Sequence, residues 1–315
     1  MDFNQIEQIL AIARKRSISE AAQELHVTQP SLSHMLAKAE REFGVRFFDR
    51  SRHPLTLTFA GEQYVKTALR MQKLEHNLRK ICQDAAQEKA GVLKIGIPSL
   101  RLAELAPAVL PEFQQLYPHV KIQCSSRPAA DMTEDLRKGL FDFLIFAPID
   151  SSPDLHFEPL YQEELRLTAA EGFLGGEDFL PGRPDVFNIR RLSRHRLLLP
   201  HPRSGLGVTL SRLMVQTGIV PQNSAVFPGN SVLYSLAAAG QGVAILPEDA
   251  LTLSKSPGAV RSFSLSPRGI GWTICAVFAR GTHISLPEHA FIDLVRRHFA
   301  HPDRELDLIP GVTVP

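Results

Sequence analysis

The stretch from Ser17 to Lys38, which reads SISEAAQELHVTQPSLSHMLAK, constrains the fold more than any other part of this chain. It contains two short amphipathic helix patterns separated by a tight three-residue connection. Ser19 is expected to cap the first helix, which has two alanines on one face. Thr28 is expected to cap the second, because Pro30 then falls in the first turn, where a missing backbone N–H costs nothing. The sequence therefore predicts two closely packed helices, as in a helix-turn-helix.

The second helix of this pair has distinct apolar and polar faces. Its apolar residues follow a three/four spacing and are expected to pack inward: Leu32, Met35, Leu36 and Ala39. The opposite face is polar and mostly uncharged: Gln29, Ser31, Ser33, His34 and Lys38. Such a face offers many hydrogen-bond donors and acceptors, which suits a helix that reads base edges in a major groove. On the hairpin alone, an ordinary helical pair with a solvated polar face is the alternative.

A basic hairpin is predicted directly after these helices. The helical pattern stops at Phe43 and Gly44, and VRFFDRSRHPLTLT then alternates apolar and polar residues around a turn at Ser51 to Pro54. This pattern predicts a two-stranded wing with basic side chains at its tip: Arg50, Arg52 and His53. Beside a helix-turn-helix, such side chains favour contact with phosphates or with a minor groove.

Residues 3–65 resemble the N-terminal domain of LysR-type transcriptional regulators. They contain, in order, the family's pattern of AA, L, QP, S, E, FG, FF, R, LT and AG: Ala21, Ala22, Leu25, Gln29, Pro30, Ser33, Glu40, Phe43, Gly44, Phe47, Phe48, Arg50, Leu57, Thr58, Ala60 and Gly61. Ile18, Ala39 and His34 depart from the usual residues, and the last of these bears on which bases are read. The resemblance implies a regulator that binds double-stranded promoter DNA.

The residues expected to contact DNA come from the second helix and the wing. They are Thr28, Gln29, Pro30, Ser31, Ser33, His34, Lys38, Arg50, Arg52 and His53. Gln29, Pro30, Ser31 and His34 are the expected base readers, and the others are expected to meet the phosphates.

A long helix is predicted from Phe59 to about Glu88, because this segment has no proline and its only glycine is Gly61. Its apolar positions form a seam: Ala60, Tyr64, Met71, Leu74, Leu78, Ile81 and Ala85. Such a seam favours a partner helix from a second subunit, although packing on its own domain is the alternative. The segment matches the linker helix of the family, and the resemblance therefore implies a homodimer or homotetramer, with RNA polymerase as a further candidate partner.

Composition excludes several classes of protein. No apolar run approaches the roughly 18 residues needed to span a bilayer. The first residues, MDFNQIEQ, lack the basic start of a secretory signal, so a cytoplasmic location without a membrane partner is expected. The 3 cysteines have no short spacing and are expected to be buried thiols, outside any disulfide or metal site.

Beyond Gly91 strands and helices alternate. Strands are predicted at 92–98, 120–126 and 141–147 with helices at 102–117 and 131–139, and a second such unit runs from 197 to 247. The segments 160–170 and 260–265 are expected to carry the chain between the two units, while 272–279 and a helix from Pro287 to Phe299 return it to the first. Two lobes with two crossings resemble the LysR-type effector domain, which is similar to periplasmic binding proteins.

The predicted fold class is therefore an α+β multi-domain protein. It comprises a winged helix-turn-helix at 1–58, a linker and dimerisation helix at 59–90, and a two-lobed α/β effector-binding domain at 91–315. Lobe I is expected at about 91–161 and 266–300, and lobe II at about 162–265. The tail after His301, rich in proline and glycine, is expected to be poorly ordered.

Ligands of open α/β sheets bind beyond the carboxyl ends of the strands. The residues predicted at these ends are Ser99, Leu100, Arg101, Ser126, Arg127, Pro148, His201, Arg203, Ser204, Asn230 and Ser231. Hydroxyls, amides and arginines facing a cleft would suit a small anionic effector such as a carboxylate. Each residue alone is as well explained by a cap of a loop or helix.

Enzyme signatures are poor in this sequence. Gly205-Leu206-Gly207 lacks the third glycine of a dinucleotide loop, and Gly229-Asn230-Ser231 lacks the second glycine of a nucleophile elbow. His195 and His201 have no adjacent carboxylate in the sequence to support a metal pair. We therefore expect no enzyme, no cofactor, no metal and no catalytic residue. The alternative function is a solute-binding protein or an enzyme of periplasmic-binding-protein-like fold with a fused helical domain.

Overall fold

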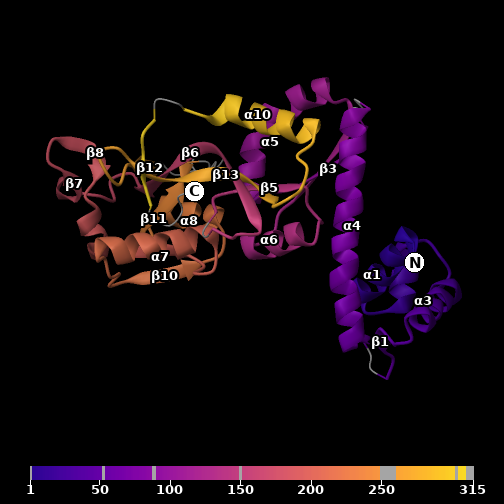
Figure 1. Cartoon of the computed structure of the whole chain (residues 1–315). Helices are drawn as coiled ribbons and strands as arrows, with labels where there is room; N and C mark the ends of the chain where they lie inside the picture. Colours follow the sequence, from indigo (N-terminus) through magenta and orange to yellow (C-terminus); the bar gives the residue numbers. More distant parts are fainter. Residues whose placement is uncertain are drawn as a thin grey trace. The chain divides into compact units, whose positions relative to one another are not determined.

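The computed structural model describes residues 2–51, 54–86, 90–148, 151–248, 260–301 and 304–309. The chain divides into two compact units, Met1–Ala86 and Gln87–Pro315, both drawn in Figure 1. Within the described ranges, no helix is both long enough and apolar enough to cross a membrane.

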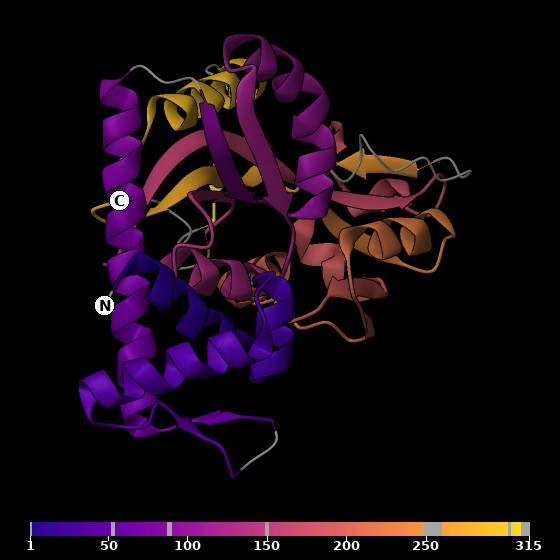
Figure 2. The ribbon, with the colours of Figure 1, turned by 90° about the vertical axis from the view of Figure 1, so that its right-hand side faces the viewer.

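The first unit is a small helical domain with a hairpin. Its elements are, in chain order, α1 (Phe3–Lys15), α2 (Ile18–Glu24), α3 (Gln29–Phe43), β1 (Phe48–Asp49), β2 (Thr56–Leu57) and α4 (Phe59–Ala85). The predicted helix pair is α2 and α3, and β1 pairs with β2 in antiparallel register as the predicted wing. Figure 2 shows this wing projecting beyond the helices of the unit.

The ends of these helices follow from their capping residues. Thr28 caps α3 as predicted, since its Oγ1 accepts a hydrogen bond from Ser31 N at 3.4 Å. Gly44 ends the same helix with φ 70°, a left-handed conformation that glycine adopts without strain. The prediction that Ser19 caps α2 was wrong. The helix already begins at Ile18, so the cap is Ser17, whose Oγ accepts from Glu20 N at 3.3 Å.

The core of the first unit is built from the predicted apolar faces. Ala21 and Ala22 are 0% and 2% exposed, so α2 lies close against its neighbours. Leu32 and Leu36 of α3 are buried in the same cluster, together with Phe47 from the start of the wing. The sequence prediction of a tightly packed helix pair is therefore confirmed.

The second unit contains one large sheet with helices on it. Its elements are, in chain order, β3 (Ala90–Gly96), α5 (Ser99–Leu116), β4 (His119–Ser125), α6 (Ala129–Arg137), β5 (Phe143–Phe146), β6 (Leu155–Ala170), the 3-10 helix η1 (Gly176–Asp178), β7 (Phe179–Leu180), β8 (Arg183–Phe187), η2 (Ile189–Arg194), β9 (Leu197–Pro200), α7 (Gly205–Thr217), β10 (Ser224–Phe227), α8 (Asn230–Ala238), β11 (Val243–Pro247), β12 (Val260–Phe263), β13 (Ile270–Ala279), α10 (Leu286–Phe299) and β14 (Asp307–Leu308).

The sheet has parallel strands at both ends and an antiparallel pair in the middle. Its order is β10-β9-β11-β6-β13-β5-β3-β4, with β12 beside β6 and β14 beside β13. β3, β4 and β5 are mutually parallel, as are β9, β10 and β11, which confirms the two predicted α/β units. β6 and β13 form a long antiparallel ribbon that joins them. We refer to β3, β4 and β5 with α5, α6 and α10 as the β3 lobe, and to β9, β10 and β11 with α7 and α8 as the β9 lobe.

The strand register places the carboxyl ends of β5 and β11 near the middle of the ribbon. β5 runs along β13 and ends at Phe146, opposite Cys275. β11 runs along β6 in the opposite direction and ends at Pro247, opposite Leu165. The stretch of β6 between these two ends is 160–164. The carboxyl ends of both parallel groups therefore approach this short stretch, where ligands of open α/β sheets bind.

Helices cover both faces of the sheet in the β3 lobe, as Figures 1 and 2 show. α5 and α10 lie side by side on one face, where the rings of Phe113 and Phe291 meet at 5.4 Å between centroids. α6 covers the other face through Met132 and Leu136, which pack against Leu144 of β5. This two-sided cover explains why all four residues of β5 are buried.

Two smaller predictions failed. The tail after His301 was expected to be poorly ordered, but Asp307 and Leu308 form β14 beside β13, and Ile309 is 2% exposed. Residues 310–315 lie outside the described residues. The cysteines were expected to be buried, yet Cys82 is exposed on α4, while Cys124 is half-buried and Cys275 is buried. Burial raises the pKa of the Cys275 thiol to about 12.

Two glycines of α7 make a matched test of this fold. A Cβ on Gly207 would lie 2.1 Å from the carbonyl oxygen of His201, whereas a Cβ on Gly205 would meet no atom within 4 Å. We expect Gly207→Ala to lower the free energy of unfolding by about 1–3 kcal/mol, because backbone must move to admit the methyl group. Gly205→Ala should change it by less than about 1 kcal/mol, in the stabilising direction. Urea unfolding of both variants measures this, and equal midpoints would contradict the close approach.

Candidate nucleic-acid interface and ligand site

The outward face of α3 is polar and open. Gln29, Pro30, Ser31, His34 and Lys38 are all exposed, as predicted, while Leu32 and Leu36 anchor the opposite face in the core. Ser33 differs from the prediction in being half-buried at the edge of this face. The exposed face carries a single formal charge, at Lys38, and presents amide, hydroxyl and imidazole groups that can bond to base edges.

A buried carboxylate joins the end of α3 to the wing. Glu40 is 9% exposed, and its Oε1 accepts hydrogen bonds from Phe47 N at 2.8 Å and Phe48 N at 3.4 Å. Its Oε2 forms an ion pair with Arg50 at 2.9 Å. This one side chain therefore fixes the wing relative to the exposed face of α3. The sequence indicated Glu40 only as a position of the family pattern, because its partners lie beyond the helix.

The wing presents part of its predicted basic tip in the described residues. Arg50 keeps 42% of its side chain exposed although it is paired with Glu40. Asp49 Oδ1 accepts hydrogen bonds from the backbone N–H of Ser51 at 2.9 Å and from its hydroxyl at 2.6 Å, which begins the turn. Arg52 and His53, the other predicted contacts, lie outside the described residues.

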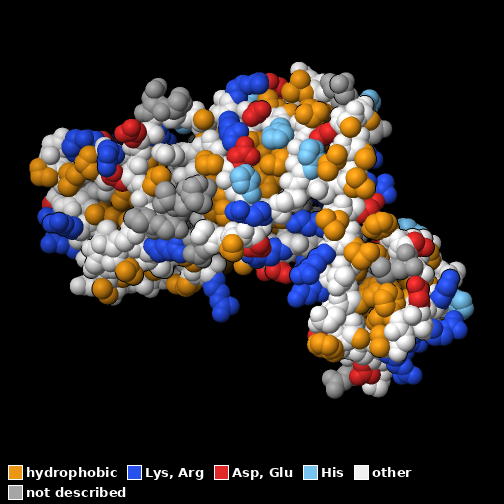
Figure 3. All heavy atoms as spheres, viewed as in Figure 1, with side chains coloured by type: hydrophobic (Ala, Val, Ile, Leu, Met, Phe, Trp, Pro, Cys, Tyr) orange, Lys and Arg blue, Asp and Glu red, His pale blue; other side chains and the backbone are white. Residues whose placement is uncertain are grey.

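The long helix α4 is packed against its own domain in its first half and has exposed apolar side chains in its second half. Its first half packs on α1, where Ala68 is buried with Ile6 and Leu10. In its second half Leu74 and Leu78 are 69% and 59% exposed. Hydrophobic side chains are visible along α4 in the space-filling view of Figure 3. The predicted seam is thus divided: its beginning is covered within the same chain, and its end is open.

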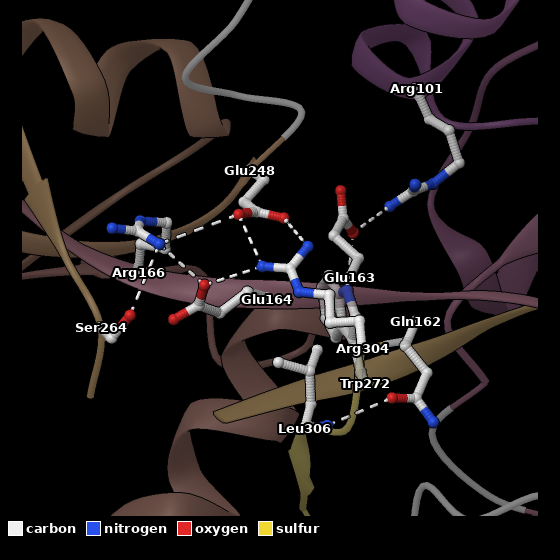
Figure 4. Close-up of polar contacts among 10 residues, drawn as sticks. All are labelled: Arg101, Gln162, Glu163, Glu164, Arg166, Glu248, Ser264, Trp272, Arg304 and Leu306. Atoms are coloured by element: carbon white, nitrogen blue, oxygen red, sulfur yellow. Dashed lines mark hydrogen bonds and ion pairs between the residues drawn. The ribbon is translucent and has the colours of Figure 1, made fainter. Parts of the chain in front are cut away.

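The middle of the ribbon carries a buried ion pair on one face. Arg101 of α5 and Glu163 of β6 are each 4% exposed and are joined at 2.8 Å (Figure 4). Trp272 Nε1 donates to the same carboxylate oxygen at 2.7 Å, and Arg101 donates to the hydroxyl of Tyr161 at 2.7 Å. Burial raises the pKa of Tyr161, so this hydroxyl stays protonated. The four side chains therefore hydrogen-bond to one another across α5, β6 and β13.

A second charged cluster lies on the opposite face, because adjacent residues of a strand point to opposite sides. Glu164 is 3% exposed, and its Oε2 pairs with both Arg166 and Arg304 at 2.8 Å. Arg304 also holds Glu248, which directly follows β11, with distances of 2.7 and 2.8 Å. Figure 4 shows the three chain segments that meet here.

Most predicted ligand residues lie where the topology placed them, at the ends of the parallel strands. Ser99 and Leu100 begin α5, Ser126 and Arg127 follow β4, Pro148 follows β5, His201, Arg203 and Ser204 follow β9, and Asn230 and Ser231 begin α8. Several already serve the fold. Ser204 caps α7 by accepting from Gly207 N at 3.0 Å, and Arg127 pairs with Asp135 at 2.7 Å. Pro148 is buried, whereas Arg203 is exposed.

The prediction that Arg101 contacts a ligand is not supported by its environment. Its guanidinium is buried and committed to Glu163 and Tyr161, so a ligand would have to break that ion pair to reach it. The reason is that Ser99 begins α5, which turns Arg101 inward from the first turn of the helix.

A hollow of about 430 Å³ lies elsewhere in the second unit, beside β7 and β8. It is lined by Gly176, Glu177, Phe179, Leu180, Pro181, Gly182, Arg183, Pro184, Asn188 and Arg191. None of these residues was predicted to bind a ligand, and the hollow does not include the carboxyl ends of the parallel strands.

Sequence reasoning missed the charged residues in and around the ribbon: Glu163, Glu164, Arg166, Glu248 and Arg304. One signal was available. The run LYQEELRLTAA places two adjacent glutamates inside an otherwise strand-like segment, so one carboxylate must point to each face. The partners could not be found, because they come from distant parts of the chain.

Comparison with known families covers both units. The model of the bacterial regulatory helix-turn-helix protein of the lysR family matches residues 3–62, and the model of the LysR substrate binding domain matches residues 86–300. This joint match does not favour the alternative of a solute-binding protein or enzyme with a fused helical domain.

Individual relatives are similar over nearly their whole length. The uncharacterized HTH-type transcriptional regulator YcgK of Bacillus subtilis (strain 168) is 27% identical, with 94% of each chain covered. The HTH-type transcriptional regulator TfdS of Cupriavidus pinatubonensis (strain JMP 134 / LMG 1197) is 25% identical, covering 94% of this chain and 98% of TfdS.

Solved structures share the fold. A full-length single-site variant of OxyR from Pseudomonas aeruginosa is 21% identical with a TM-score of 0.72, covering 94% of this chain and 98% of that one. Full-length CbnR complexed with its target DNA is 21% identical with a TM-score of 0.63, covering 94% of this chain and 99% of that one.

The buried pair on the ribbon can be tested through stability. Arg101→Ala removes the guanidinium that pairs with the buried carboxylate of Glu163, so we expect the free energy of unfolding to fall by about 3–5 kcal/mol. Arg203→Ala is the matched control: Arg203 is exposed, its side chain has no ion pair within the described part of the chain, and its loss should cost less than about 0.5 kcal/mol. Denaturant unfolding of the full chain compares them. A stable Arg101→Ala protein would show that the pair is dispensable.

Proposed function

We propose that this protein, which belongs to the LysR family of transcriptional regulators, reads DNA through α3 and responds to a small molecule through its effector-binding domain. It has a helix-turn-helix DNA-binding domain followed by an effector-binding domain, as the family does. The observation that carries the proposal is the exposed, nearly uncharged polar face of α3, held in place by a buried opposite face.

Base reading is assigned to the exposed groups of α3. The amide of Gln29 can form two bonds to an adenine edge, and the imidazole of His34 can donate or accept according to its tautomer. Pro30 and Ser31 lie beside Gln29 in the first turn, which is the part of a recognition helix that contacts bases. These contacts would give sequence preference, because they address groups that differ between base pairs.

Phosphate contacts are assigned to residues around this face. Thr28, Ser33 and Lys38 border the base-reading residues on α3, and Arg50 lies at the wing with part of its side chain exposed. Arg52 and His53 complete the proposed set from the sequence alone. The Glu40 ion pair supports Arg50 as a residue that holds the wing at a fixed distance from α3 while its exposed part meets a phosphate.

Self-association is assigned to the second half of α4. Leu74, Leu78 and Ile81 are exposed at three/four spacing, which is the spacing of a seam between two helices. A second copy of the same helix is the simplest cover, since it supplies an identical seam and gives a homodimer with two reading heads. A homotetramer needs a second kind of contact, for which we assign no residues.

Effector binding is assigned to the carboxyl ends of the strands around the ribbon. Ser99, Leu100, Ser126, Arg127 and Pro148 would contribute from the β3 lobe, and His201, Arg203, Ser204, Asn230 and Ser231 from the β9 lobe. The helix N-termini of α5, α7 and α8 and the exposed Arg203 favour an anionic effector, such as a carboxylate. A ligand that touches both lobes would favour one relative arrangement of them over others.

The remaining assignments follow from this role. A regulator that acts through promoter DNA works in the cytoplasm of a bacterial cell and alters transcription by binding, without a chemical step of its own. RNA polymerase is a candidate partner through which the bound regulator would alter transcription.

Base reading can be tested by comparing a bound duplex with a base-scrambled duplex of the same length. Gln29→Ala and His34→Ala should each reduce the difference in binding free energy between the two by about 1–3 kcal/mol, because a base contact is lost. Lys38→Ala is the control, since loss of a phosphate contact should weaken both duplexes alike and flatten the salt dependence. Titrations by fluorescence anisotropy at fixed salt measure these affinities. Equal losses on both duplexes for Gln29 and His34 would contradict their assignment.

Self-association can be tested with Leu74→Glu/Leu78→Glu. The double variant would bring four like charges into the proposed helix pair, so monomers that bind DNA poorly are expected. Val215→Glu is the control, because Val215 is 83% exposed on α7 and should tolerate the same charge without change in mass. Sedimentation velocity measures the mass, and an unchanged oligomer in the double variant would place the subunit interface elsewhere.

A further inference from the structure

The segment 304–309 packs along the edge of β13. Asp307 N donates to Gly269 O at 2.8 Å, and Ile309 N donates to Gly271 O at 3.2 Å, which pairs β14 with β13. Ile309 is 2% exposed and belongs to the main hydrophobic core. The contacts alternate along the segment, as expected for a strand added to the edge of a ribbon.

Two glycines make room for the side chain at the centre of the segment. A Cβ on Gly271 would lie 2.5 Å from Leu306 Cδ1, and a Cβ on Gly269 would lie 2.9 Å from Leu306 Cδ2. A side chain at Gly269, which directly precedes β13, or at Gly271, its second residue, would therefore compete with Leu306 for the same space. Leu306 N also donates to Gln162 Oε1 of β6 at 3.4 Å, so the segment contacts both strands of the ribbon.

Arg304 fastens the segment to two other elements. Its guanidinium holds both oxygens of Glu248, at 2.7 and 2.8 Å, and reaches Glu164 Oε2 at 2.8 Å (Figure 4). The side chain of Glu164 is 4% exposed, so solvent weakens its pair with Arg304 less than a pair on the surface. The side chains of Arg304 and Glu248 are 27% and 31% exposed, so their bidentate pair is partly open to solvent. The hydrogen bonds that Arg304 donates to Glu248 raise the pKa of Arg304.

The ion pair of Arg304 with Glu248 joins the two lobes. The segment follows α10, which packs on α5 and β5 in the β3 lobe. Glu248 directly follows β11, which belongs to the β9 lobe. Among the strands that the structure describes, β6 and β13 cross between the lobes. The segment 304–309 comes after α10 in the sequence and meets the β9 lobe through the bidentate ion pair of Arg304 with Glu248, so it adds a third connection.

We propose that the segment 304–309 is a strap that holds the two lobes of the effector-binding domain in one relative arrangement through the ion pairs of Arg304 with Glu248 and Glu164. Two crossing strands alone permit hinge or shear motion, because few residues need to change conformation. A third connection with a charged anchor disfavours every arrangement that moves Glu248 away from α10. An effector that favours another arrangement must then break or relocate this anchor.

This consequence for regulation rests on the proposed effector function, but the strap itself can be tested without effector or DNA. Two spin labels report the distance between the lobes: one at Leu116→Cys on α5, and one at Val215→Cys on α7, both exposed positions. The 3 native cysteines are replaced by alanine, and the labelled chain is diluted into an excess of unlabelled protein so that only distances within one chain are measured. Pulsed electron resonance then gives the distribution of that distance.

The unchanged chain should give one narrow distribution. Arg304→Glu should broaden or shift it, because the new carboxylate repels Glu248 and Glu164. The exchange Arg304→Glu/Glu248→Arg should narrow it again in part, since opposite charges meet once more at position 248, while the repulsion from Glu164 remains. Arg297→Glu is the matched control, because Arg297 pairs with Glu112 inside the β3 lobe, and its distribution should match that of the unchanged chain.

Amide exchange gives a second measurement on the same variants. The amides of Asp307 and Ile309 should exchange at least about tenfold faster in Arg304→Glu, and return toward the original rate in the charge exchange. A distance distribution in Arg304→Glu that superimposes on that of the unchanged chain would overturn the strap. So would a broad distribution that the charge exchange fails to narrow, because the anchor would then lie in other contacts.

Discussion

The antiparallel pairing of β6 with β13 is the constraint on which the effector-binding domain depends. β5 joins this ribbon near one end and β11 near the other, each pointing inward, so the carboxyl ends of both strand groups approach its middle. That middle stretch carries Glu163 toward one face and Glu164 toward the other, and each has arginine partners. A buried carboxylate is tolerated when it is paired and hydrogen-bonded, so these guanidinium groups are needed by the fold before any ligand arrives.

The DNA-binding domain uses a buried carboxylate in a similar way. Glu40 satisfies two backbone N–H groups at the start of the wing and pairs with Arg50, so one side chain sets the distance between α3 and β1. Removing it would leave buried donors without an acceptor, at a cost of about 1–3 kcal/mol each. In both domains, then, buried charged side chains lie behind the surfaces that we propose for DNA and effector.

Local patterns in the sequence predicted the local structure. The cap at Thr28 with Pro30, the inward face of Leu32 and Leu36 and the alternation of strands with helices all appear as expected, because each depends on residues within one or two turns. Two of the failed predictions involve distant partners. Arg101 meets Glu163 across 62 positions, and Leu306 docks where Gly269 and Gly271 leave space. The proline and glycine content of this tail suggested disorder, because the residues that order it, on β6, on β13 and after β11, lie elsewhere in the chain. Which residues contact DNA and effector stays a prediction.

We propose that two copies of α3, held by a two-fold dimer, read base sequence. Selection of bound duplexes from a random pool tests this without knowledge of the target sequence. The recovered sequences are expected to share two inverted half-sites whose centres lie about one helical turn, or a multiple of it, apart. A recovered pool without a common motif would contradict base reading, and a motif with one half-site alone would contradict the two-fold dimer.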